Sequence, residues 1–555
     1  MVQMLGGQAV VQTLLSLGAR SGFGVPGESY LAVLDAFYDA PDFRFIGCRN
    51  EGGAAFMAEA WAKLTGEVGL CFVTRGPGAT NASIGVHTAM QASTPVLLFV
   101  GQVGLEHQGR EAFQELDYRQ VFGPIAKYAT EITDVSRIPE IICRAWSMAI
   151  SGRPGPVVVA LPEDVLTQSA EIAIPTVPIL APKSAVVAAD LEQLAARLQS
   201  AQRPVILVGG GRWDAQDRSA LLACAHKLNV PVVTGFRYHD LFDNTDPLFV
   251  GEAGVGMTAN TKRVLTEADV VLAVNLRFGE MTTDAFTLFG ANRGEQWIAQ
   301  SHRSGDEFHK YVAPNLSMIS DPAPLLHGLK ARLEAADMRQ DLAWAKSARA
   351  GFKAAQTATA QPSPVDMGVV TNTVQTLLPA DAIVTNGAGN FAIWPNKFLQ
   401  FSEHQRLLAP QSGAMGYGLP AAIAAKVEYP ERCVLCFAGD GDFQMNCQEL
   451  GAALQADARP IVLIVNNGSY GTIRMHQERH FPRRVSGTEI INPDFSALAR
   501  AYGFHGERVE RTEEFADAFS RALASPTGAV LDLNVASEAI TPGMTIKELH
   551  SLSEG

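Results

Sequence analysis

The sequence predicts an α/β protein built from three doubly wound domains with mostly parallel sheets. Short apolar runs without polar alternation recur along the 555 residues, as expected of strands that are covered on both faces. Longer amphipathic segments such as 51–64 and 448–455 separate these runs, and strands that alternate with helices form parallel sheets. Ligands of such sheets bind beyond the carboxyl ends of the strands, so we expect the functional residues there.

Two proline-bearing stretches divide the chain into three parts. Residues 173–183 contain three prolines, and residues 357–364 combine small residues with Pro362 and Pro364. We therefore expect domains at residues 1–172, 184–335 and 365–540, each of a common domain size. The expected strands are 69–74, 95–100 and 156–161 in the first part, 204–208, 231–234 and 269–274 in the second, and 382–385, 433–437, 460–465 and 529–533 in the third.

The composition narrows the class of function. A net charge of −13 with 18% charged residues indicates a soluble globular protein and argues against a nucleic-acid or anionic membrane surface. The N-terminus lacks the pattern of a signal peptide, and no apolar run approaches the roughly 20 residues of a membrane span. Seven scattered cysteines suit a reduced cytoplasm. Cys433 and Cys436 form a CxxC, but on a strand they would point to opposite faces, so we expect core residues rather than a metal or redox pair.

Polar residues follow two of the expected strands in the third domain. One strand ends at Gly439-Asp440-Gly441 and the next at Asn466-Asn467. A strand–helix–strand crossover of this length brings two parallel strand ends side by side, so the carboxylate of Asp440 and the amide oxygen of Asn467 can converge on one cation. Mg²⁺ prefers such oxygen ligands and takes phosphate oxygens from its ligand. A plain Gly-Asp-Gly turn is the alternative that this pattern alone leaves open.

With further motifs, the sequence resembles the thiamine diphosphate (ThDP) enzymes, and within them the acetolactate synthase group, over essentially the whole chain. The additional motifs lie at residues 49–60, 74–81, 101–103, 112–115, 152–156 and 413–420. The resemblance implies a pyrimidine-binding (PYR), a central and a pyrophosphate-binding (PP) domain in this order, with ThDP and Mg²⁺ as cofactors. It also implies a ThDP site between two subunits, and hence a homodimer or a homotetramer.

The resemblance assigns a role to each residue that matches a motif. Asp440, Asn467 and the backbone carbonyl of Ser469 are expected to bind Mg²⁺. Met415 would support the bent shape of ThDP, and Glu51 would hydrogen-bond the aminopyrimidine ring and favour its imino tautomer. A helix-terminal glutamate that interacts with the helix dipole is the alternative for Glu51. The other expected cofactor-binding residues are Gly413, Gly439, Gly441, Asp442, Tyr470, Gly471 and Ile473.

The implied reaction is decarboxylation of a 2-oxo acid, followed by protonation or by ligation to a second carbonyl compound. The alternatives are a flavin-dependent oxidase of pyruvate type, an acyloin lyase, and a catalytically silent ThDP-binding regulator. Retention of Glu51 argues against the silent regulator, because such a protein has no need of a proton-relay acid.

Several positions depart from the synthase pattern and predict a different substrate. Glu28 stands where the synthases carry glycine, and His107 precedes the Phe113-Gln114 pair that lines the synthase pocket. His476 stands where the synthases carry a tryptophan. We predict catalytic or specificity roles for Glu28, His107, Gln114 and His476, with a solvated loop charge at Glu28 and a structural imidazole at His476 as alternatives. His476 and His480 share a helical face, but no third ligand is evident, so we do not expect zinc.

The central domain of this group binds flavin in the synthases and oxidases. Arg153 and Arg277 match positions used there, but the expected strand at 297–301 ends without the carboxylate that usually contacts the adenosine. FAD is therefore possible but not favoured.

Overall fold

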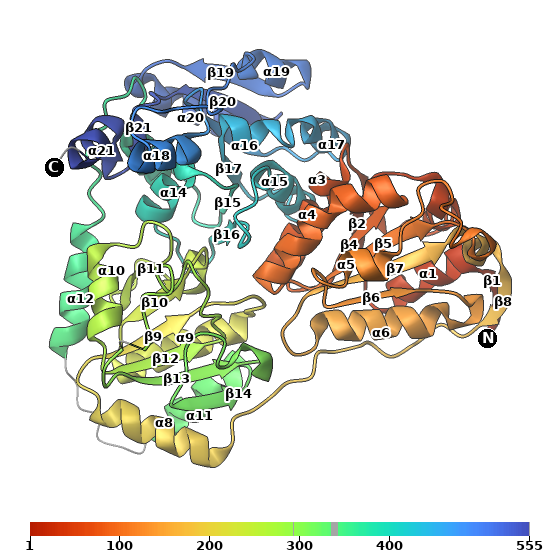
Figure 1. Cartoon of the computed structure of the whole chain (residues 1–555), viewed down its shortest axis with the longest axis horizontal. Coiled ribbons are helices and arrows are strands. Elements are labelled where there is room, and N and C mark those ends of the chain that lie inside the picture. The colour runs from red at the N-terminus through yellow and green to blue at the C-terminus, as the bar shows by residue number, and fades with distance from the viewer. Residues whose placement is uncertain (292, 335–341, 554–555) are drawn as a thin grey trace.

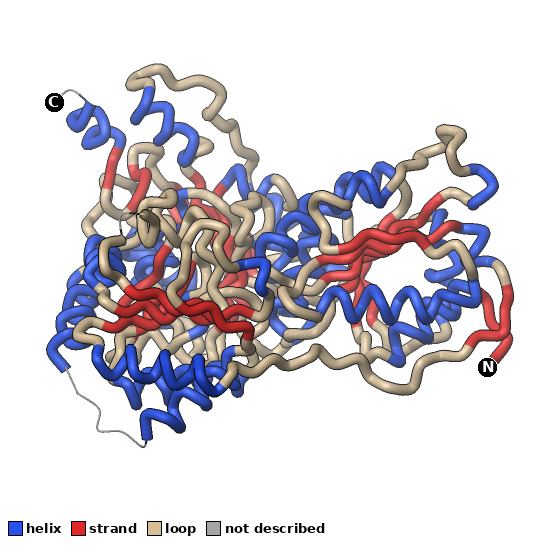
Figure 2. The backbone as a smooth tube through the Cα atoms, turned by 60° about the horizontal axis from the view of Figure 1, so that its bottom comes forward, coloured by secondary structure: helices blue, strands red, loops and turns tan. Residues whose placement is uncertain are grey.

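The computed structural model describes residues 1–291, 293–334 and 342–553, which fold into three domains (Figure 1). Each domain contains a six-stranded sheet in which all neighbouring strands are parallel. The sheets lie between helices, as the second view shows (Figure 2). The predicted fold class is therefore confirmed.

The PYR domain has the strand order β3-β2-β4-β5-β7-β6. Its strands are β2 (Ser21–Gly24), β3 (Arg44–Gly47), β4 (Gly69–Val73), β5 (Val96–Gln102), β6 (Tyr128–Glu131) and β7 (Pro156–Pro162). Its helices are α1 (Gly6–Ser16), α2 (Leu31–Tyr38), α3 (Glu51–Thr65), α4 (Gly76–Ala92), α5 (Tyr118–Phe122), α6 (Ile138–Ile150) and α7 (Glu163–Thr167). The chain enters and leaves this domain through an antiparallel pair of β1 (Val2–Leu5) and β8 (Ser169–Ile172).

The central domain has the order β11-β10-β9-β12-β13-β14. Its strands are β9 (Pro204–Val208), β10 (Val232–Gly235), β11 (Phe249–Ala253), β12 (Val270–Val274), β13 (Trp297–His302) and β14 (Leu316–Ile319). Its helices are α8 (Ala188–Ser200), α9 (Ala215–Leu228), α10 (Ala259–Glu267) and α11 (Pro322–Glu334), and α12 (Leu342–Ala354) leads toward the third domain.

The PP domain has the order β16-β15-β17-β18-β20-β19. Its strands are β15 (Ile383–Asn386), β16 (Arg406–Leu408), β17 (Val434–Gly439), β18 (Ile461–Asn466), β19 (His505–Val509) and β20 (Ala529–Asn534). Its helices are α13 (Met367–Leu377), α14 (Ile393–Phe398), α15 (Gly418–Glu428), α16 (Asp440–Gln444), α17 (Leu450–Gln455), α18 (Gly471–His480), α19 (Phe495–Ala501) and α20 (Phe515–Ala524). The short hairpin β21 (Ala539–Thr541) and β22 (Met544–Thr545) and helix α21 (Ile546–Ser553) follow.

The strands of the PP sheet are buried on both faces, as their unbroken apolar runs predict. Along β17, Cys436 belongs to a core cluster on one face of the sheet, whereas Leu435 and Phe437 belong to the cluster on the other. Cys433 packs against the second cluster, so the two cysteines of the CxxC do lie on opposite faces. All seven cysteines are free thiols. The expectation that this pair is part of the core is confirmed.

Helix α3 joins the PYR and PP domains. Its small residues allow close packing, and it is buried along almost its whole length between α4 and the PP helix α15 (Figure 1). Residues of α3 and α15 belong to one apolar cluster that crosses the domain boundary. Among the helices of the described ranges, none is long and apolar enough to cross a membrane.

The closest approach of α3 and α4 gives a testable constraint at Gly85. A Cβ atom at Gly85 would lie 2.3 Å from the Cβ of Ala55, so alanine there must force the two helices apart. We expect Gly85→Ala to destabilise the protein by about 1–3 kcal/mol and to lower the midpoint of thermal unfolding. Gly543→Ala is the control, because its Cβ meets no atom within 4 Å. Equal midpoints for both variants would contradict the tight packing of α3 on α4.

Candidate functional site

A cavity of about 620 Å³ opens at the carboxyl edge of the PP sheet. Residues that follow β15, β17 and β18 line it, together with residues that follow β10 and β12 of the central domain and with His87 and Gln91 of α4. Every predicted cofactor-binding residue except Glu51 lines this cavity: Gly413, Met415, Gly439, Asp440, Gly441, Asp442, Asn467, Ser469, Tyr470, Gly471 and Ile473. The structure therefore brings together residues that are far apart in the sequence.

The register of the PP sheet places Asp440 beside the loop that contains Asn467. Gly439 pairs with Val465, so both polar segments begin at the same level of the sheet. Asp440 is only 2% exposed, and its carboxylate accepts hydrogen bonds from the backbone N–H groups of Gly441 (2.9 Å) and Gly468 (2.7 Å). Burial raises the pKa of Asp440, and these hydrogen bonds act in the opposite direction. The carboxylate is thus fixed in orientation by both strand ends.

Asn492 is a further contact of Asp440 that the sequence reasoning missed. Its Nδ2 donates to Asp440 Oδ2 (2.7 Å) and to Asn466 Oδ1 (2.8 Å). Asn466 in turn donates to the buried carboxylate of Asp532 at 2.9 Å. Asn492 lies 52 residues beyond Asp440 on an irregular loop, and no local pattern in the sequence indicates this contact.

The loop after β18 contributes Asn467 and Ser469 to the lining of the same cavity. Asn467 Oδ1 accepts a hydrogen bond from the backbone N–H of Ser469 (3.0 Å), and the Ser469 carbonyl accepts one from Gly471 (2.8 Å). The Ser469 hydroxyl is buried and has no hydrogen-bond partner among the described residues. One carboxylate, one amide oxygen and one carbonyl are hard oxygen donors, so this set fits Mg²⁺. Groups of three or more histidine, cysteine or acidic side chains suited to a metal do not occur in the described ranges.

Met415 lies on a turn whose backbone is held by hydrogen bonds to Asp442. Asp442 Oδ1 accepts hydrogen bonds from the backbone N–H groups of Gly416 (2.8 Å) and Ala388 (3.1 Å), and the Asn446 side chain donates to the Gly416 carbonyl (2.7 Å). Gly416 has a φ of +80°, which a glycine adopts without strain. Burial raises the pKa of Asp442 to about 7. The turn therefore projects Met415 into the cavity from a rigid base.

Glu51 begins α3, and it does not line the cavity that contains Asp440. Asn50 caps the helix by accepting a hydrogen bond from Gly52 N (2.8 Å). The Glu51 carboxylate accepts one from Asn81 Nδ2 on α4 (2.9 Å). Because Glu51 follows β3, it lies at the carboxyl edge of the PYR sheet, the edge at which parallel sheets bind ligands.

Three of the predicted specificity residues lie at this same edge of the PYR sheet. Glu28 follows β2, and His107 and Gln114 lie in the loop after β5. Glu28 is exposed, and the His107 side chain is 57% exposed and lies 3.4 Å from Glu106. Gln114 has a φ of +64° and accepts a hydrogen bond from Gly76 N through its carbonyl (2.9 Å). These residues lie outside the Asp440 cavity, so their roles stay predictions.

His476 is exposed on α18, and it too lies outside the cavity, which Thr472 and Ile473 of the same helix do line. Its ring stacks on that of His480 with centroids 6.3 Å apart. Partial burial lowers the pKa of His476, and the nearby charges of Arg479 and His480 lower it further.

The cations expected to contact a flavin are already paired within the chain. Arg153 and Arg277 bind the two carboxylate oxygens of Glu307 at 3.0 and 3.3 Å, and Lys310 binds it at 2.7 Å. Burial opposes the ionisation of Glu307, but the hydrogen bond from Lys310 and the charges of the two arginines outweigh it and lower its pKa to about 2.

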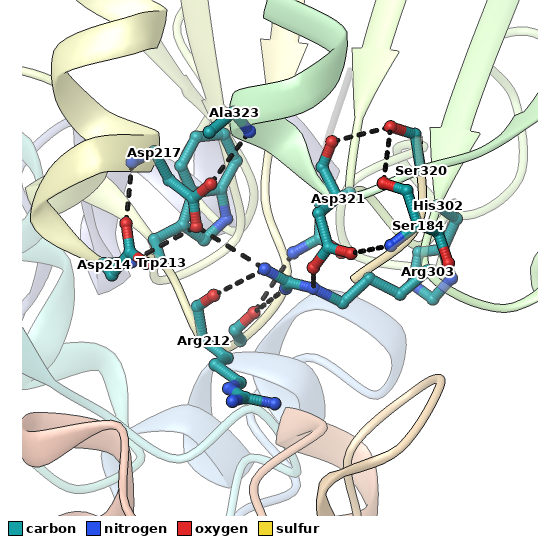
Figure 3. A network of polar contacts seen from close by, with 12 residues as sticks. Ser184, Arg212, Trp213, Asp214, Asp217, His302, Arg303, Ser320, Asp321 and Ala323 are labelled. Carbon is teal, nitrogen blue, oxygen red and sulfur yellow. Dashed lines mark hydrogen bonds and ion pairs between the residues drawn. The ribbon is translucent and has the colours of Figure 1, made fainter. Parts of the chain in front are cut away.

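Arg303 occupies the carboxyl edge of the central sheet (Figure 3). It donates to the carbonyls of Gly211 (3.0 Å) and Arg212 (2.9 Å) after β9 and to Asp321 (2.6 Å) after β14. This bridge crosses the place where a dinucleotide would approach the strand ends. FAD therefore stays possible but is not favoured by these contacts.

Comparisons with known proteins agree with the three-domain organisation. Family models of thiamine pyrophosphate enzymes match the N-terminal TPP binding domain at residues 4–121, the central domain at 191–329 and the C-terminal TPP binding domain at 387–533.

Curated relatives match almost the whole chain. The acetolactate synthase large subunit of Parasynechococcus marenigrum is 33% identical over 549 residues, which covers 96% of this chain and 87% of the relative. A probable acetolactate synthase large subunit of Methanocaldococcus jannaschii is 32% identical and covers 96% and 92%. The acetolactate synthase isozyme 2 large subunit of Escherichia coli is 30% identical and covers 96% of each chain. The chain therefore belongs to the thiamine pyrophosphate enzyme family, and within it to the group of acetolactate synthase large subunits.

Proposed function

We propose that this protein uses ThDP and Mg²⁺ to decarboxylate a 2-oxo acid and to protonate the product or join it to a second carbonyl compound. One observation carries this proposal: the Asp440 carboxylate, the Asn467–Gly471 loop and the Met415 turn line one cavity at the carboxyl edge of the PP sheet. ThDP, when bound, supplies a nucleophilic carbon and an electron sink for decarboxylation.

The PP residues would position the cofactor. Asp440, Asn467 and the Ser469 carbonyl would hold Mg²⁺, which binds the diphosphate. Asp440 is fixed by three donors from Gly441, Gly468 and Asn492, so it can present an oxygen to the metal without rearrangement. Met415 would support the cofactor from its rigid turn. The apolar walls would exclude water from the reacting carbon.

A second copy of the chain would complete the site. Glu51 and the Asp440 cavity lie apart in one chain, yet both face the carboxyl edge of their own sheet. Apolar side chains near both edges are exposed, including Ile84, Met445 and Ile473. We therefore propose a homodimer, or a homotetramer built from two dimers, in which Glu51 of one chain meets the ThDP of the other.

Glu51 would then exchange a proton with the aminopyrimidine ring. Asn81 donates to one carboxylate oxygen of Glu51 at 2.9 Å and leaves the other oxygen for the ring. General acid–base catalysis needs the group within hydrogen-bond reach of the proton it moves, and in the proposed dimer the cofactor of the partner chain would bring the ring to that distance.

The departures from the synthase pattern would set the substrate. Thr472 lines the cavity and His476 lies one helical turn beyond it, while Glu28, His107 and Gln114 would come from the partner's PYR domain. Polar groups at a desolvated site discriminate strongly between acceptors. We propose weak formation of acetolactate from pyruvate alone and better activity with a bulkier or more polar carbonyl partner, in a cytoplasmic enzyme. The pairing of Arg153 and Arg277 with Glu307 speaks against the flavin-dependent oxidase.

Removal of the metal-binding carboxylate tests the cofactor site. We expect Asp440→Ala to weaken ThDP binding by at least about 100-fold, because the diphosphate would lose its bridging cation. Titration of tryptophan fluorescence with ThDP and Mg²⁺ measures this affinity. The exposed Asp517→Ala on α20 is the control and should bind as the wild type does. Wild-type affinity in Asp440→Ala would refute the site.

Substitution of Glu51 separates binding from activation. Glu51→Gln should still bind ThDP, but turnover should fall by roughly 10²–10⁴-fold, because an amide cannot exchange the proton that switches the ring tautomer. Exchange of the C2 proton of bound ThDP, followed by NMR after a quench, reports this step directly. Exchange at the wild-type rate would show that Glu51 has another role.

Exchange of His476 tests the specificity residues. With pyruvate as the only substrate, we expect His476→Trp to form more acetolactate than the wild type, because a large apolar ring would replace an imidazole one helical turn beyond Thr472, which lines the cavity. His480→Trp, one turn further along α18, is the control. Efficient acetolactate formation by the wild type, unchanged in His476→Trp, would instead support an ordinary acetolactate synthase.

A further inference from the structure

Glu449 of the PP domain contacts the segment that leads into Glu51. Glu449 is fully buried and ends the short helical turn Cys447–Glu449 between α16 and α17. It reaches across the domain boundary to the start of α3, which belongs to the PYR domain of the same chain. Sequence reasoning did not identify it, because its partners are about 400 residues away.

The Glu449 carboxylate binds the backbone of the two residues before Glu51. The N–H of Arg49 donates to its two oxygens at 3.1 and 3.2 Å, and the N–H of Asn50 donates to Oε1 at 2.8 Å. Asn50 is also the residue that caps α3. A single carboxylate therefore holds the backbone of the two residues that precede Glu51.

Neither Glu449 nor the first turn of α3 has room to move at this contact. A Cβ atom at Gly53 would lie 2.9 Å from the carboxyl carbon of Glu449, so the first turn of α3 packs directly on this group. The Arg49 guanidinium also reaches the PP domain, where it donates to the Gly451 carbonyl (3.1 Å) and to Gln455 (2.9 Å). Hydrogen bonds therefore run in both directions between the segment before Glu51 and the segment that contains Glu449.

Domain packing alone does not require a carboxylate here. The helices α3 and α15 that join the PYR and PP domains already share one continuous apolar cluster. Burial raises the pKa of Glu449 to about 7, which means that the buried charge has a cost. All hydrogen bonds of this buried carboxylate go to the turn before Glu51, so it acts on that turn.

We propose that Glu449 is a positioning residue that aims the Glu51 carboxylate at the cofactor. This inference rests on the proposed function of Glu51. The carboxylate of Glu51 has a hydrogen bond from Asn81 only, among the described residues, so the direction of its backbone decides where it points. A displacement of about 1 Å at such a group can cost roughly 10²-fold in rate.

The first test is Glu449→Gln in the full-length protein. With the amide oxygen in the place of Oε1, both N–H groups keep an acceptor, but a neutral and weaker one, and the NH₂ in the place of Oε2 faces the Arg49 N–H as a second donor. In the cofactor-free protein, we expect faster amide hydrogen exchange in a peptide that covers residues 47–53. In the protein loaded with ThDP and Mg²⁺, we expect nearly unchanged ThDP affinity but slower exchange of the C2 proton, by roughly 10–100-fold.

Glu59→Gln is the matched control. Like Glu449, Glu59 is a buried glutamate that bonds across the same domain boundary, where it accepts a hydrogen bond from Tyr417 (2.5 Å). It lies on α3 itself, two turns from Glu51. It should leave the exchange of residues 47–53 and of the C2 proton unchanged. Glu449→Asp, which retracts the carboxylate by one methylene group, should show the pattern of Glu449→Gln and serves if the glutamine variant does not fold.

The outcomes separate this inference from the proposed function. If the wild type activates ThDP and Glu51→Gln does not, while both Glu449 variants behave as the wild type, the positioning role is refuted and the proposed function stands. An equal effect in Glu59→Gln would also refute it, since a general loosening of the boundary would then suffice. A wild type that does not activate ThDP would overturn both.

Discussion

The buried carboxylate of Asp440 is the constraint on which the site depends. A carboxylate at 2% exposure is costly unless donors surround it. Three donors meet it here, from Gly441 on its own strand end, from Gly468 on the neighbouring strand end and from the side chain of Asn492. By satisfying this charge, the chain fixes the loop after β18 and with it Asn467 and the carbonyl of Ser469. In the proposed function, the same arrangement would give a hard cation an oxygen-lined site without further reorganisation.

The residues of the proposed site lie at the carboxyl edges of two different sheets, and the two domains that contain these sheets pack tightly on each other. The PP edge contains Asp440 and Met415, and the PYR edge contains Glu51. Helix α3, packed between α4 and α15, connects the two domains, and Glu449 accepts hydrogen bonds from the two residues that precede this helix. In the proposed dimer the two edges serve different cofactors, so one chain would hold together parts of two sites.

The sequence predicted contacts correctly where the residue types and their spacing along the chain both indicated them. The interval from Asp440 to Asn467 is that of a strand–helix–strand unit, and the register of β17 and β18 confirms the juxtaposition. It failed where a partner comes from a distant segment with no pattern of its own, as with Asn492 and Glu449. Arg153 and Arg277 show a third case: the residue types match a flavin site, but Glu307, which pairs with both, is visible only in three dimensions. In the proposed dimer, contacts with the partner chain would decide the roles of Glu28, His107 and His476, and one chain does not contain those contacts.

The central claim, that each ThDP site combines Glu51 of one chain with Asp440 of another, is tested most directly by subunit complementation. Glu51→Gln and Asp440→Ala chains with different affinity tags would be co-expressed, and the mixed dimer isolated through both tags. In that dimer one site contains both substitutions and the other contains neither, so we expect about half of the wild-type activity from two nearly inactive parents. A mixed dimer as inactive as its parents would contradict the shared site.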